Sequence, residues 1–286
     1  MLNYSVTPVQ EIHDSFIEKA GVRLLIKRED LNHPLVSGNK WWKLKYNLEE
    51  AVKLGHTTLL TFGGAYSNHI YATAAAARQL ELKSIGLIRG EETLPLNDVI
   101  SFAIDQGMKL IYVSRGEYRS KTEKAFIDEL HQTFGAFYLI PEGGTNHLAV
   151  KGVTEFARTL GNDFDYLCCA VGTGGTMAGL ISGTSSQKKL IGFPVLKGGE
   201  FLQDEIENLL PNKHKNWSLN NDYHFGGYAK MNPPLMSFIE NFKTNHDIQL
   251  DPVYTGKAMF GLFDLVAKNC FSKGSTLLFI HTGGVR

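Results

Sequence analysis

Apolar residues along the chain form short runs that alternate with stretches of helical periodicity. Runs such as TTLLTF and STLLFI are typical of strands buried on both faces of a parallel sheet. We predict eight strands, at residues 22–27, 57–62, 84–88, 109–113, 137–140, 166–170, 189–193 and 275–280. Eight helices are predicted between and after them, at residues 41–54, 68–80, 125–133, 147–160, 176–182, 201–209, 234–245 and 256–268.

This alternation predicts an α/β fold built from βαβ units, with mostly parallel sheets and helices on both faces. About eight strands and eight helices exceed one small doubly wound domain, so two sheets are expected. The sequence PEGGT at residues 141–145 is a plausible boundary between them. The polar stretch at residues 211–222 is the best prediction for an exposed loop.

Composition narrows the class of protein. The 286 residues include 29 Lys+Arg and 29 Asp+Glu, and a net charge of zero argues against a nucleic-acid partner. No apolar run approaches the roughly 20 residues of a membrane span, so no membrane partner is expected. Three cysteines without CxxC spacing, and an N-terminus without a basic and then apolar leader, favour a reducing, cytoplasmic location. No metal site is predicted.

A glycine cluster, VGTGGTMAG, follows a predicted strand and opens a helix. Consecutive backbone N–H groups at a helix start can bind an anion, although a tight turn without a ligand is the alternative. A dinucleotide site needs an acidic residue about 20 positions later, and a nucleotide P-loop needs GK[ST]; neither is present. A single monophosphate is therefore favoured, held by Gly172, Thr173, Gly174, Gly175 and Thr176.

A second segment, SGNK, places Lys40 at the start of an amphipathic helix. The positive end of the helix dipole disfavours an ammonium there, which would lower the pKa of the amine and suit Schiff-base chemistry. A surface lysine beside an Asn cap is the plainer alternative.

Two more strand ends carry polar groups. GGAYSNH brings Ser67, Asn68 and His69 to a helix start, and HTGG brings Thr282 to the end of the last strand. Ligands bind at the carboxyl ends of parallel strands in open α/β sheets. Helix capping, a packed histidine and a chain-terminal turn are the corresponding structural alternatives.

Taken in order, six motifs resemble one family: KREDLNHPLVSGNKWWKL, TFGGAYSNH, PEGGTNHLAVKG, AVGTGGTMAGL, DPVYTGKAM and FIHTGG. They are similar to fold type II pyridoxal-phosphate (PLP) enzymes of the tryptophan-synthase-β-like group. Within that group they resemble the 1-aminocyclopropane-1-carboxylate (ACC) deaminase / D-cysteine desulfhydrase family. The resemblance implies PLP as cofactor, a homodimer, a smaller α/β domain at residues 43–141 and a larger PLP-binding domain from residues 1–42 and 142–286.

The resemblance also assigns roles to residues. Lys40 would bond covalently to the cofactor, and Lys43 and residues 172–176 would lie at its phosphate. Asn68 would bind the 3′-oxygen of PLP, and Thr282 would face the pyridine nitrogen. Ser67, with Asn68 and His69 beside it, would meet the substrate carboxylate. Tyr254, and less directly Tyr228, would be the active-site tyrosines.

The reaction that the resemblance implies is β-elimination from a small amino acid, first of all D-cysteine to pyruvate, ammonia and hydrogen sulfide. Thr255 and Thr282 stand where the deaminase branch has Glu and Leu, and both differences resemble the desulfhydrase branch. ACC deaminase is the alternative; an NAD-dependent oxidoreductase or a non-catalytic amino-acid-binding module is more remote. Trp41, Trp42 and Tyr66 also depart from the family pattern, and whether they reshape the pocket is left open by the sequence.

Overall fold

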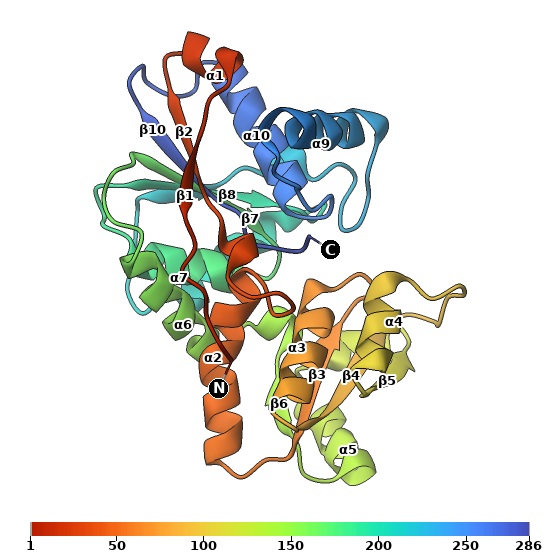
Figure 1. Cartoon of the computed structure of the whole chain (residues 1–286). Coiled ribbons are helices and arrows are strands. Elements are labelled where there is room, and N and C mark those ends of the chain that lie inside the picture. The colour runs from red at the N-terminus through yellow and green to blue at the C-terminus, as the bar shows by residue number, and fades with distance from the viewer. Residues whose placement is uncertain (1, 286) are drawn as a thin grey trace.

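Ten strands form two separate sheets in the computed structural model, which describes residues 2–285 (Figure 1). The six-stranded sheet has the order β1-β2-β10-β7-β8-β9, and only β1 runs antiparallel to its neighbour. The four-stranded sheet, β5-β4-β3-β6, is entirely parallel. The strands are β1 Val9–Ile12, β2 Arg23–Lys27, β3 Thr58–Gly63, β4 Lys83–Arg89, β5 Met108–Val113, β6 Tyr138–Ile140, β7 Tyr166–Val171, β8 Lys189–Pro194, β9 Trp217–Leu219 and β10 Thr276–Ile280.

Helices cover both faces of each sheet, as Figure 1 shows. The α-helices are α1 Ser15–Lys19, α2 Asn39–Lys53, α3 Asn68–Gln79, α4 Asp98–Asp105, α5 Lys124–Phe134, α6 His147–Arg158, α7 Gly175–Gly183, α8 Leu202–Leu209, α9 Pro233–His246 and α10 Thr255–Ala267. Short 3₁₀ helices are η1 Glu29–Leu31, η2 Glu117–Ser120, η3 Glu142–Gly144, η4 Gly199–Phe201 and η5 Asn221–Tyr223. The α/β class with mostly parallel sheets is confirmed.

Strand β10 shows why the apolar runs are continuous. Leu277 and Phe279 pack with α9 and α10 on one face of the six-stranded sheet, whereas Leu278 and Ile280 pack with α2, α6 and α7 on the other. Alternate side chains of a strand point to opposite faces, so a strand buried on both must be apolar at every position.

All eight predicted strands and all eight predicted helices are present, with ends shifted by one or two residues. Two strands and two α-helices were missed: β1, β9, α1 and α4. The expected exposed loop at residues 211–222 is wrong in part, because β9 pairs with β8 there and extends the six-stranded sheet. The domain boundaries at residues 43 and 141 stay a prediction.

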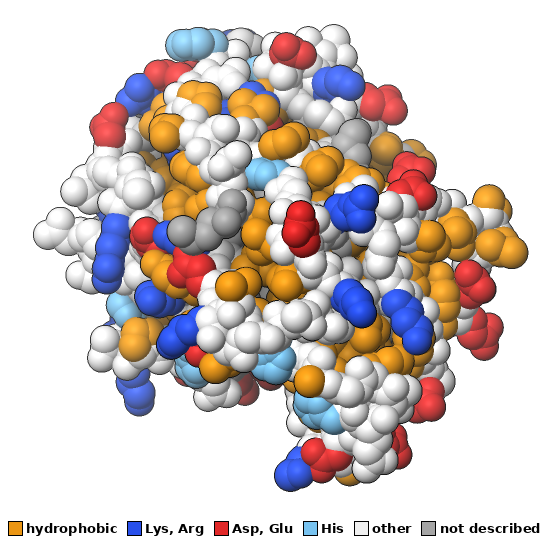
Figure 2. Space-filling view, turned by 60° about the horizontal axis from the view of Figure 1, so that its bottom comes forward, with side chains coloured by type: hydrophobic (Ala, Val, Ile, Leu, Met, Phe, Trp, Pro, Cys, Tyr) orange, Lys and Arg blue, Asp and Glu red, His pale blue; other side chains and the backbone are white. Residues whose placement is uncertain are grey.

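Two further properties of the described chain bear on its surroundings. On the face in Figure 2, acidic and basic side chains are interspersed, as the equal numbers of the two allow. Among residues 2–285, no helix combines the length and the apolar character that crossing a bilayer requires.

Candidate active site

A cavity of about 520 Å³ lies where strand ends of both sheets meet. This volume is within the range of about 300–1,000 Å³ that small-molecule sites occupy. Twelve of the thirteen residues predicted for the site line it: Lys40, Lys43, Ser67, Asn68, His69, Gly172, Thr173, Gly174, Thr176, Tyr228, Tyr254 and Thr282. Gly175 is buried directly behind the wall, at the first turn of α7.

Contact with the C-terminal turn fixes the start of α2, which carries Lys40. Gly38 precedes the helix with φ +69°, and a Cβ atom there would lie 2.0 Å from the carbonyl oxygen of Thr282. That oxygen accepts a hydrogen bond from the Asn39 N–H at 3.2 Å. Only glycine allows this conformation and this close approach together. The SGNK motif is therefore a packing requirement as well as the source of the lysine.

The Lys40 amine donates a hydrogen bond to Asn39 Oδ1 at 2.9 Å. Burial lowers the pKa of Lys40 to about 8, and the negative charge of Asp251 opposes this only in part. The direction agrees with the sequence prediction, but the main cause is loss of water around the amine and not the helix start.

Lys43 lies one turn along α2 and points its amine at two threonines. Its Nζ donates to Thr145 Oγ1 at 2.8 Å and lies 3.5 Å from Thr173 Oγ1. Burial, with the nearby charge of Lys40, holds the pKa of Lys43 well below its usual value. A bound dianion would reverse this effect, because an opposite charge favours the ammonium.

The glycine cluster forms the other side of the same corner. Gly174 has φ +80° and caps α7, so the first N–H groups of the helix open toward the cavity. A Cβ at Gly175 would lie 3.0 Å from the Thr145 side chain and 3.3 Å from Lys43 Cε. Hydroxyls, a buried amine and helix N–H groups together are the donors that a phosphate monoester needs, so these residues fit the cofactor phosphate.

The second helix start, at α3, is built by the SNH segment. The Ser67 hydroxyl accepts from the N–H groups of His69 and Ile70, at 3.2 and 3.4 Å. His69 is 1% exposed, and burial with the charges of Lys43 and Lys40 keeps its pKa well below the usual range.

The ring of His69 is held by two threonines. Thr61 Oγ1 donates to the Ile140 carbonyl and is therefore left to accept from His69 Nε2 at 2.7 Å, while Nδ1 lies 3.4 Å from Thr73 Oγ1. Both ring nitrogens thus have protein partners. The predicted contact of His69 with substrate stays a prediction.

Two tyrosines close the cavity on the side of the six-stranded sheet. The rings of Tyr254 and Tyr228 are 6.1 Å apart at 69°, and Lys40 Nζ lies 6.0 Å from the Tyr254 ring. Burial raises the pKa of Tyr254 well above its ordinary value, and of Tyr228 to about 12. Both phenols therefore stay protonated near neutral pH and can donate a proton or a hydrogen bond.

Asp251, which the sequence analysis did not identify, connects the two sides of the site. Its Oδ1 accepts from the N–H groups of Val253 and Tyr254, at 2.9 and 2.6 Å, and its Oδ2 lies 3.4 Å from Asn68 Nδ2. Asp251 is 5% exposed and fixes the turn that presents Tyr254. An Asp four residues before a helix start is a turn signal that could have pointed to it.

Other lining residues were not predicted as site residues, although Asn39 and Glu142 lie within two of the six motifs. Asn39 Nδ2 donates to Thr176 Oγ1 at 2.7 Å and so connects the starts of α2 and α7. Arg89, Lys121 and Glu142 line the outer part of the cavity. The position of Arg89 at the carboxyl end of β4 is a signal that could have found it.

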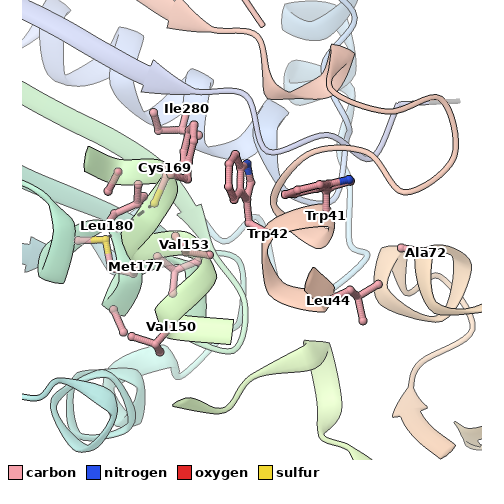
Figure 3. Close-up of a cluster of buried hydrophobic side chains, with 14 of the residues drawn as sticks. Trp41, Trp42, Leu44, Ala72, Val150, Val153, Cys169, Met177, Leu180 and Ile280 are labelled. Atoms are coloured by element: carbon pink, nitrogen blue, oxygen red, sulfur yellow. Dashed lines mark hydrogen bonds between the residues drawn. The ribbon is translucent and has the colours of Figure 1, made fainter. Parts of the chain in front are cut away.

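Trp41, Trp42 and Tyr66, whose effect on the pocket the sequence left open, do not line the cavity. Trp41 and Trp42 are 7% and 6% exposed and belong to the core cluster that α2 forms with α6 and α7 (Figure 3). Trp42 donates its indole N–H to the buried carboxylate of Glu29 at 2.7 Å. Tyr66 is 53% exposed.

The two threonines that distinguish this sequence from the deaminase branch, Thr255 and Thr282, differ in whether they line the cavity. Thr282 lines the cavity, whereas Thr255 is fully buried and its hydroxyl accepts from the Asp251 N–H at 2.8 Å. Only Thr282 can contact a cofactor or substrate directly. Among residues 2–285, no cluster of three His, Cys, Asp or Glu side chains is placed to hold a metal ion.

The chain matches the family described as "Pyridoxal-phosphate dependent enzyme" over residues 1–283. A Pyrococcus abyssi relative, provisionally named as an ACC deaminase, is 32% identical over 98% of this chain and 89% of its own. A mitochondrial Arabidopsis thaliana relative, "Bifunctional D-cysteine desulfhydrase/1-aminocyclopropane-1-carboxylate deaminase", is 31% identical over 93% of this chain and 73% of its own. The crystal structure of an ACC deaminase homologue superposes with a TM-score of 0.85 at 31% identity, covering 98% of this chain and 89% of that one.

Proposed function

Because this chain belongs to the family of pyridoxal-phosphate dependent enzymes, within the ACC deaminase / D-cysteine desulfhydrase group, we propose that it is a lyase that removes a β-substituent from a small amino acid. The first candidate substrate is D-cysteine, which with one water gives pyruvate, ammonia and hydrogen sulfide. The second candidate reaction is the opening of ACC, which with one water gives α-ketobutyrate and ammonia. The family match favours PLP over a nicotinamide cofactor.

Bound PLP supplies an electron sink that withdraws electron density from the Cα of an amino acid. Lys40 is the residue for covalent attachment, because its amine is enclosed by the cavity and has a pKa of about 8. Lys43, Thr173 and the start of α7 would hold the phosphate. Asn68 and Thr282 would contact the ring, and Ser67 at the start of α3 would bind the substrate carboxylate.

Lys40 is also the best candidate for general base. A lysine with its usual pKa keeps its proton near neutral pH, whereas one with a pKa of about 8 releases and recovers it readily. Once the amine is free of the cofactor, its Nζ would take the Cα proton. Asn39 Oδ1 holds that nitrogen at 2.9 Å and so limits its positions.

Tyr254 would assist the leaving group. The phenol is protonated over the working pH range, and its ring lies 6.0 Å from Lys40 Nζ. Asp251 fixes its backbone through two N–H groups nearby. A proton from the Tyr254 hydroxyl would convert the departing sulfide to a neutral or singly charged species.

The single observation that favours D-cysteine over ACC is the hydroxyl of Thr282 on the cavity wall. A carboxylate beside the pyridine nitrogen would keep that nitrogen protonated, whereas a hydroxyl leaves it largely neutral. A weaker sink suffices to expel a thiolate from a β-carbon. Opening an unactivated cyclopropane ring requires a stronger one.

The test compares product formation from D-cysteine, L-cysteine, D-serine and ACC by the PLP-loaded protein. We expect pyruvate and sulfide from D-cysteine, and loss of both in Lys40→Ala. Lys53→Ala is the matched control, because Lys53 lies on the same helix with its side chain 75% exposed. α-Ketobutyrate from ACC without pyruvate from D-cysteine would refute the argument from Thr282.

We propose further that the protein acts as a homodimer on a free small amino acid, in the cytoplasm and without nucleic-acid or membrane partners. Fold type II enzymes of this group, which the chain resembles, support the dimer by analogy. Light scattering of the purified protein tests it: a monomer mass at micromolar concentration would contradict the proposal.

A further inference from the structure

Arg89 lines the cavity but has no role in the proposed reaction. It ends β4, and its side chain is exposed to the open part of the cavity. The ion pairs formed within residues 2–285 include none with Arg89. The guanidinium is therefore a cation in a ligand cavity without a carboxylate partner.

Two tyrosine rings lie beside this guanidinium. It lies 5.8 Å from the ring centroid of Tyr118 and 6.0 Å from that of Tyr228. Cations at this distance from an aromatic ring are weakly attracted to it. Tyr118 is 3% exposed, so one of the two rings belongs to the rigid core of the four-stranded sheet. The guanidinium is thus oriented without being neutralised.

The position of Arg89 relative to the substrate loop follows from strand register. Ile88 of β4 pairs with Gly63 of β3, so Arg89 lies beside Gly64 at the beginning of the turn that leads to Ser67. Neighbouring strands are about 4.8 Å apart. A Cβ at Gly64 would lie 3.5 Å from Tyr228 Cε1, which places that tyrosine over the same turn.

Successive steps of about 6 Å connect this point to the reactive lysine. Tyr228 is 6.0 Å from the Arg89 guanidinium and 6.1 Å from the Tyr254 ring, which is 6.0 Å from Lys40 Nζ. Lys40, Tyr254, Tyr228 and Arg89 thus form a continuous series of neighbours along the wall of one cavity. A substrate side chain that extends along this wall from the Cα would approach Arg89.

The other charges of the outer cavity leave Arg89 unbalanced. The Lys121 ammonium lies 3.4 Å from Glu142 Oε2, so these two neutralise each other. Lys40 and Lys43 are assigned to the cofactor in the proposed function. Glu205 also lines the cavity, but it belongs to α8, beside the phosphate-binding loop.

We propose that Arg89 is an anion-binding subsite for the side-chain end of the substrate, so that the enzyme prefers amino acids whose side chain ends in an anionic group. The proposal rests on the proposed function, since it takes Lys40 as the anchor of the substrate. The group it would bind is a carboxylate at the end of the side chain, whereas the sulfur of cysteine lies one bond from Cβ and stays at Tyr254. A guanidinium is suited to this, because it stays charged and offers paired donors.

The test uses ligand pairs of one shape that differ in charge: the D- and L-forms of aspartate against asparagine, and of glutamate against glutamine. Binding to the PLP-loaded protein is measured by the change in the cofactor absorption band and, independently, by calorimetry. Neither readout requires turnover, so a protein that fails to release pyruvate can still support or overturn the proposal.

We expect at least one acid to bind about 10-fold more tightly than its amide. A fully buried guanidinium would give a larger ratio, but Arg89 is exposed and water weakens its attraction to the anion. The preference should disappear in Arg89→Gln and survive in part in Arg89→Lys, which also guards against loss of folding. Lys109→Gln is the matched control: Lys109 is exposed on the same sheet, 5.2 Å from the ring of Phe134, and does not line the cavity.

Three results would overturn the proposal. Acids and amides could bind equally within two-fold, or none of the ligands could bind at all. Arg89→Gln could also weaken both members of a pair by the same factor, which would make Arg89 a wall of the cavity and not a reader of charge.

Discussion

Replacing Lys43 by methionine separates what this residue does for the cofactor from what it does for the fold. The Lys43 side chain is 2% exposed and its pKa is held well below the usual value by burial, so its amine is a costly group in the cofactor-free protein. A bound phosphate makes the same amine favourable. The two effects have opposite signs, and one substitution tests both.

The expected magnitudes follow from the contacts of the amine. A hydrogen bond to a charged group contributes about 1.5–3 kcal/mol, so Lys43→Met should weaken PLP binding by about 10- to 150-fold. Its two hydroxyl partners, Thr145 and Thr173, also hydrogen-bond each other, so neither loses its last partner. The free energy of unfolding of the cofactor-free protein should therefore be unchanged or slightly higher.

PLP affinity is measured by absorbance titration of the cofactor-free protein, and stability by urea unfolding of the same preparation. Lys53→Met, on the exposed face of the same helix, should change neither. An unchanged PLP affinity in Lys43→Met would refute the phosphate assignment. A loss of more than about 2 kcal/mol without cofactor would show instead that the amine stabilises the fold.

Three further predictions test the frame of the site. Gly38→Ala should lower the free energy of unfolding by about 2 kcal/mol or more, because its methyl group would lie 2.0 Å from the Thr282 carbonyl oxygen. Gly55 is the control, since it has a similar φ but open space around it. Gly55→Ala should cost about 1 kcal/mol in the same urea assay. Trp42→Phe removes a hydrogen bond to a buried carboxylate and should cost about 1–2 kcal/mol in urea unfolding, while KM for the best substrate stays within two-fold because the indole does not line the cavity. The pKa of Lys40 is about 8 in the folded protein against 10.5 when unfolded, so the unfolded state binds the proton more tightly. The cofactor-free protein should therefore gain stability relative to Lys40→Met as the pH rises from about 8 to about 10. A constant difference in the free energy of unfolding across that range would contradict the lowered pKa.

Local patterns were sufficient for most elements but not for the short ones. Strands such as β10 are apolar throughout because both faces are covered, and that pattern is visible in the sequence. Helix α4 was missed because eight residues with a mixed apolar run do not separate helix from strand by period alone. Its N-cap, Asn97, which accepts from the N–H groups of Val99 and Ile100, was the available signal. The three residues of β9 are strand only because β8 offers them a partner.

Some features of the site are likewise visible in the sequence, whereas others depend on the tertiary structure. Glycines at helix starts, and lysines 40 and 43 three positions apart on one helix, can be identified in the sequence because turn geometry and helix period are local properties. The pKa of Lys40 could be predicted in direction but not in cause, because burial depends on segments far away in the chain. Trp41 and Trp42 adjoin Lys40 in sequence yet point into the core, since successive residues of a helix face different directions (Figure 3).

The sequence by itself determined that this protein is an α/β enzyme, and it predicted a glycine-rich phosphate site and a reactive lysine at a helix start. Only the tertiary structure decided which side chains share the cavity with that lysine. Asp251 Oδ2 lies 3.4 Å from Asn68 Nδ2 across 183 positions of sequence, and the register of β3 and β4 places Arg89 beside Gly64. The physical reason is that local periodicity fixes the direction of a side chain relative to its own element, whereas packing between distant elements fixes what that side chain meets.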